Sequence, residues 1–337
     1  MHAAEDRDGQ PAGATAGRAW DGRVVERTWR RRGENAEPNK TWLCFNMSTA
    51  LYPLATLAQI ERTPSREDGV PQDLEEDLRA YGCKLIHQAG ILLRQKQVAV
   101  ATAQILFHRF WFVTSMKQFG IGDIGMGALY LASKLEECPI RMRDLINVYD
   151  LLLQRATHTL GPAHTNHANN PEFKYATMSY FGSTFYELKD ALVVSEMQIL
   201  KRLGFNVHVV LPYGTLINYL RVLGLTSEEE ACTRAWGYLN DALQTPVYAL
   251  YPVPTIVSAA ILLTTRHLRI PLPSTPPNCW WDLFDAAWED VWSVCGHIMR
   301  LYRPRSEGER ARIVGMVNKK EVRRWLEEQA ASGNGAS

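Results

Sequence analysis

The chain has 337 residues, of which 46% are hydrophobic and 22% charged, and its formal net charge at pH 7 is +1. This composition is typical of a globular protein with two domains, and the near-neutral charge argues against a surface built to bind nucleic acid or membrane. No apolar run approaches the roughly 20 residues that span a bilayer, and the charged N-terminus is unlike a secretory signal.

The six cysteines are scattered, and none forms a Cys-x-x-Cys pair. This spacing argues against a zinc ribbon and against a thiol redox motif. It is typical of reduced thiols in the cytosol or nucleus. We therefore expect neither a metal ion nor another cofactor.

Residues 1–40 are rich in Gly, Ala, Arg and Glu, which predicts a disordered tail. Short apolar pieces interrupted by prolines over residues 41–72 predict an extended arm with one short helix. The apolar periodicity that follows predicts a first set of helices, over residues 73–94, 97–115, 121–137, 141–155 and 184–203. The segment 156–182, which holds several His, Asn, Gly and Pro residues, predicts a long inserted loop.

A second set of helices is predicted over residues 213–223, 228–243, 254–268 and 286–302, with a short piece near 280–285. No strand alternation is visible, so we expect an all-α fold. The charged segment 307–329 predicts a solvent-exposed helix that gives way to a Gly/Ala/Ser tail. We expect a first domain over 73–207, a second over 208–305, and a charged C-terminal helix and tail over 306–337.

The helix predicted over 121–137 is the most informative segment. It carries small residues that allow neighbouring helices to approach closely, at Gly125, Gly127, Ala128 and Ala132. Over the stretch 127–139 the charges gather at one end, at Lys134, Glu136 and Glu137, just before a proline stop. This pattern is typical of a central core helix whose tip faces a partner.

The same pattern occurs a second time in the chain. Leu263, Arg266 and Pro271 match Leu131, Lys134 and Pro139 at one constant spacing. A period this long is not that of a solenoid repeat. It predicts two tandem copies of one helical domain.

The segment Leu131–Glu137 is similar to the signature of the cyclin box. Further segments match in sequence order, at residues 88–94, 97–99, 107–110, 143–148 and 203–209. The chain therefore resembles the cyclin family over about residues 60–305, and within that family it is most similar to the transcription- and splicing-associated cyclin L group. The resemblance implies an all-α fold of two tandem cyclin boxes with about five helices each.

The resemblance also implies a function. The chain is expected to be a regulatory subunit, not an enzyme, that forms a heterodimer with a nuclear cyclin-dependent kinase and activates it. By similarity to cyclin L the kinase is of the PITSLRE class and acts in RNA polymerase II transcription and pre-mRNA splicing. Transcription or splicing proteins are expected as further partners, whereas membrane binding and direct nucleic-acid binding are not expected.

Two charged residues carry the expected contact with the kinase. By resemblance, Lys134 and Glu196 bind the backbone of a regulatory helix of the kinase and of its flanking loop. Around them, an apolar groove is expected from Leu131, Leu135, Leu200, Phe205 and Val207. Taken alone, such charges are typical of solvated helix positions and such leucines of a core, and for Leu200, Phe205 and Val207 both interpretations stay open.

Two other functions are compatible with the sequence. A cyclin-fold scaffold that activates no kinase, similar to TFIIB or to a spliceosomal adaptor, would show a basic stripe along both boxes. Another transcription cyclin, similar to cyclin K or cyclin C, is compatible with the segments 108–110 and 117–119.

A few further residues have less informative patterns. For Arg109, beside an aromatic cluster, we favour a partly buried side chain paired with an acidic residue. His164 and His167 have the spacing of a metal-binding pair, but no Cys or carboxylate pattern supports one. The basic run at residues 30–32 fits part of a nuclear localisation signal.

Overall fold

The computed structural model describes residues 54–160 and 173–334. Over these ranges every regular element is a helix and no strand occurs, which confirms the predicted all-α fold. Several predictions lie outside the described residues, namely those for the 1–40 tail, for residues 41–53, for the basic run at 30–32, and for His164 and His167.

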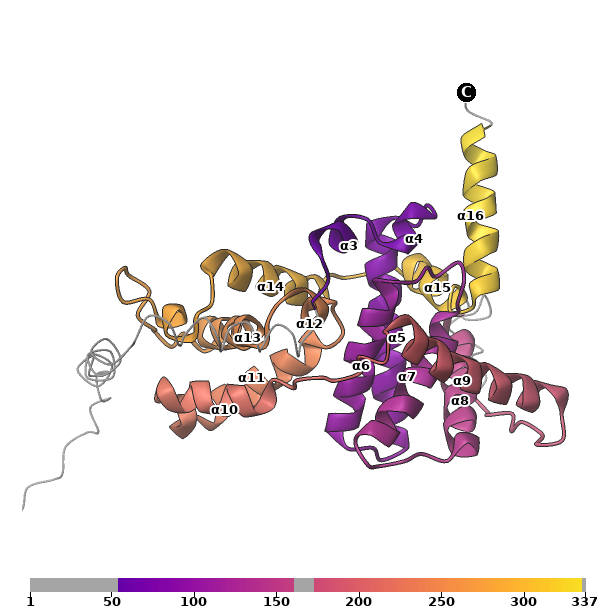
Figure 1. Cartoon of the computed structure of the whole chain (residues 1–337), viewed down its shortest axis with the longest axis horizontal. Coiled ribbons are helices and arrows are strands. Elements are labelled where there is room, and N and C mark those ends of the chain that lie inside the picture. Colours follow the sequence, from indigo (N-terminus) through magenta and orange to yellow (C-terminus); the bar gives the residue numbers. More distant parts are fainter. Residues whose placement is uncertain (1–53, 161–172, 335–337) are drawn as a thin grey trace, which may run out of the picture. The chain divides into compact units, whose positions relative to one another are not determined.

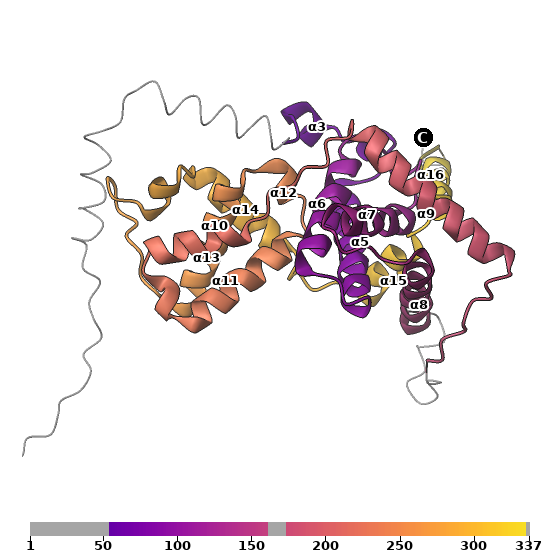
Figure 2. The same ribbon diagram turned by 60° about the horizontal axis from the view of Figure 1, so that its bottom comes forward.

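The first set of helices surrounds one central helix. It consists of α5 (Gln72–Leu92), α6 (Gln97–Trp111), α7 (Ile121–Leu135), α8 (Met142–Leu160) and α9 (Ser183–Arg202). Helix α7 contacts each of the other four, and its residues Ala128, Leu129 and Ala132 are fully buried (Figures 1 and 2). The predicted ranges agree with these helices within a few residues, except that α8 continues to Leu160, into the segment expected to be a loop.

Close packing at α7 depends on its glycines. A Cβ atom added at Gly127 would lie 2.7 Å from the Cβ atom of Ser195 on α9 and 3.1 Å from the backbone nitrogen of Glu196. A Cβ atom added at Gly125 would lie 3.3 Å from the hydroxyl oxygen of Tyr149 on α8. These distances leave no room for a side chain at Gly127, which confirms the predicted close approach of neighbouring helices.

The second set of helices has its own core. It consists of α10 (Tyr213–Val222), η2 (Leu225–Ser227), α11 (Glu229–Ala242), α12 (Val247–Leu250), α13 (Val253–Leu268), η3 (Trp280–Phe284) and α14 (Trp288–Arg300). Helix α13 contacts α10, α11, α12 and α14, as α7 contacts its neighbours in the first set. The short helix α12 was not predicted.

Helix α6 joins the two cores. Its residues Ala101 and Ile105 pack into the second core, whereas Leu106 and Phe107 pack into the first. The buried His108 places its Nε2 atom 3.2 Å from the carbonyl oxygen of Leu243, which lies just after α11. The two sets therefore share one helix as a common wall.

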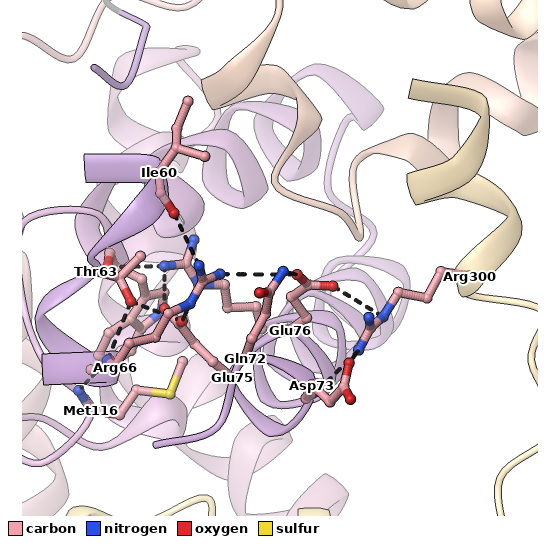
Figure 3. A network of polar contacts seen from close by, with 12 residues as sticks. Ile60, Thr63, Arg66, Gln72, Asp73, Glu75, Glu76, Met116 and Arg300 are labelled. Carbon is pink, nitrogen blue, oxygen red and sulfur yellow. Dashed lines mark hydrogen bonds and ion pairs between the residues drawn. The ribbon is translucent and has the colours of Figure 1, made fainter. Parts of the chain in front are cut away.

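The end of the predicted N-terminal arm is built into the first set. Residues 54–72 form two short helices, α3 (Leu57–Glu61) and α4 (Pro64–Glu67), instead of the expected extended segment with one helix. The carboxylate of Glu75 is fully buried and accepts hydrogen bonds from Thr63, Arg66 and Arg79 at 2.8, 2.8 and 2.6 Å (Figure 3). A buried charge needs such partners, so this carboxylate holds α4 against α5.

Helix α5 also carries contacts to the end of the second set. Arg300, the last residue of α14, pairs with Asp73 at 2.8 Å and with Glu76 at 3.0 Å (Figure 3). Arg305 pairs with Asp77 at 2.6 Å. The acidic first turns of α5 therefore lie against the basic segment that follows α14.

The C-terminal segment is exposed over much of its length, as its charges predicted, but it is not a single helix and a few of its residues are buried. It forms two helices, α15 (Glu307–Gly315) and α16 (Lys319–Asn334), and its buried apolar residues pack on the first set. The carbonyl oxygen of Val317 accepts a 2.8 Å hydrogen bond from the backbone of Ile121, at the start of α7. A Cβ atom added at Gly122 would lie 2.8 Å from the Val317 side chain, so the absence of a side chain there admits this segment. Charge composition did not reveal this contact, because the few apolar residues that pack inward stand among many charged ones.

Candidate functional site

The structure brings Lys134 and Glu196 together. The Lys134 ammonium, in the last turn of α7, donates a 2.6 Å hydrogen bond to Oε1 of Glu196 on α9. The ammonium also lies 4.0 Å from the ring centroid of Tyr130, one helical turn earlier. The Lys134 side chain is 42% exposed and that of Glu196 is 16% exposed, so the pair lies at the surface.

Local structure explains this geometry. Ser195 packs directly on Gly127, so the next residue of α9, Glu196, is held beside the C-terminal half of α7. Side chains of a helix lean toward its N-terminus, which turns Lys134 back toward Tyr130 and Glu196. A cation in a last turn also complements the negative end of the helix dipole.

The pair contributes little to stability. Ion pairs at a protein surface are typically worth about 0–1 kcal/mol, and the 42% exposed side chain of Lys134 keeps this pair in contact with water. An ammonium has three donors and a carboxylate has two oxygens, and the described residues use one of each. The remaining donor and acceptor sites are therefore available to the backbone of a partner.

The end of α7 is fixed by its own hydrogen bonds. The backbone nitrogen of Cys138 bonds to the carbonyl of Ser133 at 2.8 Å, with Glu137 in the left-handed region at φ 52°. This pattern is a Schellman cap. Glu136 is oriented by a 2.7 Å hydrogen bond from the Thr102 hydroxyl of α6. The tip of α7 therefore presents its charges from a rigid frame.

The expected groove residues occupy different environments. Leu131 is 4% exposed and belongs to the first core, whereas Leu135 is 41% exposed. Leu200 and Val207 are half-buried against that core. Leu131 is therefore a core residue beneath the site, whereas the apolar side chain of Leu135 on α7 is exposed and accessible to a partner.

Phe205 is the most unusual of the expected site residues. Its side chain is 73% exposed, and its backbone adopts φ 60° directly after Gly204 at φ 58°. The left-handed region costs a residue with a side chain about 1–2 kcal/mol. The strain arises because the backbone nitrogen of Phe205 completes the cap of α9 through a 2.8 Å bond to the carbonyl of Leu200. A strained backbone that holds an aromatic ring in water points to a binding role.

Sequence reasoning missed an apolar stripe on α9. Val193, Val194 and Met197 are exposed although they are apolar, and they flank Glu196 along the helix. Val193, Glu196 and Leu200 share one face through their helical spacing. The helical spacing could have identified them, because these residues lie outside the face of α9 that buries Leu192 and Ile199. They extend the surface around the ion pair.

His108 and Arg109 are buried and contact other residues of the chain. Burial, with a smaller effect of Arg79, lowers the pKa of His108 to about 3, so the ring is neutral near pH 7. The Arg109 side chain is buried and donates a 2.7 Å hydrogen bond to the carbonyl of His208.

In the part of the chain that the structure describes, no cluster of three or more His, Cys, Asp or Glu residues is placed to hold a metal ion. No helix among residues 54–160 and 173–334 has the length and apolar character needed to cross a membrane.

The chain is similar to known proteins over most of its length. The family described as "Cyclin, N-terminal domain" matches residues 54–208. Cyclin-L1 of Danio rerio is 36% identical over 280 residues, which cover 82% of this chain and 51% of the relative. Cyclin-L2 of Homo sapiens is 36% identical over 273 residues, covering 81% of this chain and 49% of that protein. The chain spans about half the length of these curated relatives.

The fold also matches a solved structure. A chain in the crystal structure of the yeast RNA Pol II CTD kinase CTDK-1 complex aligns with a TM-score of 0.55. The alignment covers 74% of this chain and 73% of that chain at 17% sequence identity, which shows a shared fold.

Proposed function

Because the chain belongs to the cyclin family, we propose that it is the regulatory subunit of a nuclear cyclin-dependent kinase. By similarity to cyclin L, the kinase is of the PITSLRE class and acts in RNA polymerase II transcription and pre-mRNA splicing. The observation that carries the proposal is the surface ion pair of Lys134 and Glu196, which is rigidly held, contributes little to stability and retains free hydrogen-bonding capacity.

The pair would recognise the backbone of the kinase. Lys134 would donate to carbonyl groups at the end of the kinase regulatory helix, and Glu196 would accept from backbone amides of the flanking loop. Charge-assisted hydrogen bonds of this kind are stronger than neutral ones and fix the orientation of the partner. Their contribution grows as water leaves the interface, because the effective dielectric constant falls.

The apolar residues around the pair would supply the contact area. Leu135, Met197 and Phe205 are exposed in the free chain and would be covered by apolar side chains of the kinase helix. Half-buried Leu200 and Val207 would form the floor. Docking would shift the kinase helix inward and complete the Lys–Glu ion pair of the kinase active site. The chain itself would position a partner and carry out no chemical step.

Of the alternatives, the scaffold similar to TFIIB is less well supported. It requires a basic stripe, and the chain has a net charge of only +1. The segments that were compatible with cyclin K make contacts within the chain itself. Phe110 and Phe119 pack edge to face at 5.6 Å between ring centroids, and the Lys117 ammonium lies 3.8 Å from the Asp68 carboxylate. They therefore favour no particular kinase.

The proposal is tested by affinity purification of the full chain from its own cells, followed by mass spectrometry and a kinase assay. Three baits are compared: the native chain, a Lys134→Ala, Glu196→Ala variant, and a control with Glu187→Ala and Lys201→Ala. The control residues are exposed on the same helix α9. We expect a stoichiometric nuclear kinase with the native and control baits and its loss with the site variant.

Two results would count against the proposal. Recovery of splicing or transcription proteins without any kinase would favour the scaffold. A kinase that binds the native and site variants equally would leave the regulatory role in place and remove Lys134 and Glu196 from the interface.

A further inference from the structure

The end of α13 borders a cavity that the proposed kinase contact does not use. Its volume is about 410 Å³, within the range of about 300–1,000 Å³ typical of ligand sites. Its lining includes the last turn of α13 with Arg266, the segment that follows it, and the rings of Trp280, Trp281 and Trp288. By the internal repeat, Arg266 stands where Lys134 stands in the first set.

Tryptophan rings form one wall of the cavity and continue beyond it. The rings of Trp281 and Trp288 lie 4.3 Å apart between centroids, and Trp280 meets Trp281 edge to face at 6.0 Å. Trp292, one turn further along α14, lies 6.0 Å from Trp288 and is 63% exposed. A row of indole rings with one end in solvent is a suitable surface for proline rings and for an extended backbone.

The polar groups of the cavity are mainly hydrogen-bond donors. Arg266 and Arg269 are both exposed and line it, and neither guanidinium has an ion pair or a hydrogen bond to any described residue. No Asp or Glu is among the described residues of the lining. A ligand that pairs with both guanidinium groups must therefore carry hydrogen-bond acceptors and negative charge.

We propose that this cavity, together with Trp292, docks an extended, proline-containing acidic segment of a partner protein. Carboxylates of the segment pair with Arg266 and Arg269, and its prolines lie on the indole rings. Proline-rich segments bind aromatic grooves at low entropic cost, because their extended helix is already formed in solution. The site is separate from the Lys134–Glu196 surface and does not depend on the proposed kinase function.

A nucleic acid fits the site less well than a peptide. Single strands also stack on aromatic rings, but their affinity comes from a basic groove that follows the backbone. Here the elements that carry the tryptophan rings also carry carboxylates, Asp282 on η3 and Glu289 on α14, and Asp285 directly follows η3. These carboxylates would repel a long polyanion, whereas a short acidic segment can reach the two arginines alone.

The test uses the full chain and a fluorescein-labelled synthetic peptide of alternating glutamate and proline, with binding followed by fluorescence anisotropy. We expect saturable binding that weakens about tenfold or more in an Arg266→Glu, Arg269→Glu variant, since two charge-assisted contacts are lost. The matched control reverses two exposed arginines outside the cavity, Arg221→Glu and Arg310→Glu, and should bind as the native chain does.

Two further measurements separate the contribution of the indole rings to peptide binding from that of the peptide's negative charge. Trp292→Ala, at an exposed position, should weaken binding several-fold without loss of the fold. A peptide with lysine in place of glutamate should not bind. The arginine variant should still recover the kinase, so a failure here is distinguishable from a failure of the proposed function.

Three results would overturn the inference. One is the absence of saturable binding up to about 1 mM peptide. Another is equal affinity of the native chain and the Arg266→Glu, Arg269→Glu variant. The third is tighter binding of a single-stranded oligouridine that the same variant abolishes, which would make the cavity a nucleic-acid site.

Discussion

The same helix end occurs twice in this chain, and its surroundings differ. At the end of α7, Lys134 is paired with Glu196. At the end of α13, Arg266 has no acidic partner among the described residues and borders a cavity of about 410 Å³. The difference comes from the neighbouring element, which is the closely packed helix α9 in one case and a tryptophan-rich segment in the other. The repeated core fixes the helix, and the element beside its last turn decides the chemistry of the surface.

The largest expected effect separates the two helix ends by function. Exchange of the first pair, Lys134→Glu with Glu196→Lys, retains an ion pair but presents each charge from the wrong helix. We expect loss of kinase association worth about 2–5 kcal/mol and a change in unfolding free energy below about 1 kcal/mol. Arg266→Ala should leave the kinase bound. Pull-down assays and urea unfolding measure the two effects, and kinase retention by the exchanged variant would contradict the assignment.

A second effect tests the packing that creates the first surface. Gly127→Ala should destabilise the chain by about 1–3 kcal/mol, because its methyl group would overlap Ser195. The control is Gly237→Ala on α11, where nothing lies within 4 Å of the added Cβ atom. There the higher helix propensity of alanine should stabilise by up to about 1 kcal/mol. If both variants shifted the urea midpoint in the same direction relative to the native chain, α7 and α9 would not be closely packed at Gly127.

A third effect concerns the wall between the two sets. The pKa of His108 falls from an ordinary value of 6.5 to about 3 on folding, so the unfolded chain binds a proton that the folded chain excludes. The contribution of neutral His108 to the free energy of unfolding is therefore complete above pH 6.5, and it is lost as the pH falls toward 3. One pH unit below 6.5 the loss should be about 1.4 kcal/mol. His108→Gln should remove this dependence of the urea midpoint on pH, and an unchanged dependence would assign it to other groups.

The smallest expected effect concerns Phe205. Asparagine tolerates the left-handed region better than phenylalanine does, so Phe205→Asn should leave stability unchanged or raise it by about 1 kcal/mol. Kinase affinity should fall, because the exposed ring is lost from the contact area. Thermal unfolding and a binding titration give the two values. A clear loss of stability would mean that the ring is held by packing and not for a partner.

The sequence predicted the helices well because helical periodicity is a local pattern. The periodicity of residues 121–137 was sufficient to define α7 as the central helix, and the resemblance named Lys134 and Glu196, which the structure places 2.6 Å apart. Their function in kinase binding stays a prediction.

Other features depend on contacts between residues far apart in the chain. Val317 is buried because Gly122, nearly two hundred residues earlier, leaves room for it, and no local pattern encodes that contact. The cavity beside Arg266 depends on how the rings of Trp281 and Trp288 pack after the chain has folded. The exposure of Phe205 follows from a cap whose second left-handed residue is not a glycine, which sequence propensity disfavours.

The hydrogen bond from Ile121 to Val317 has a consequence for the order of folding during synthesis. Domains generally fold as units while the chain emerges from the ribosome. The buried residues of the second core, apart from Ala101 and Ile105 of the earlier helix α6, lie within residues 209–300, so this core is complete once those residues have emerged. The first core also contains Ile313, Met316 and Val322. The half of the chain that is translated first is therefore finished last, and until then the start of α7 lacks its contact with Val317.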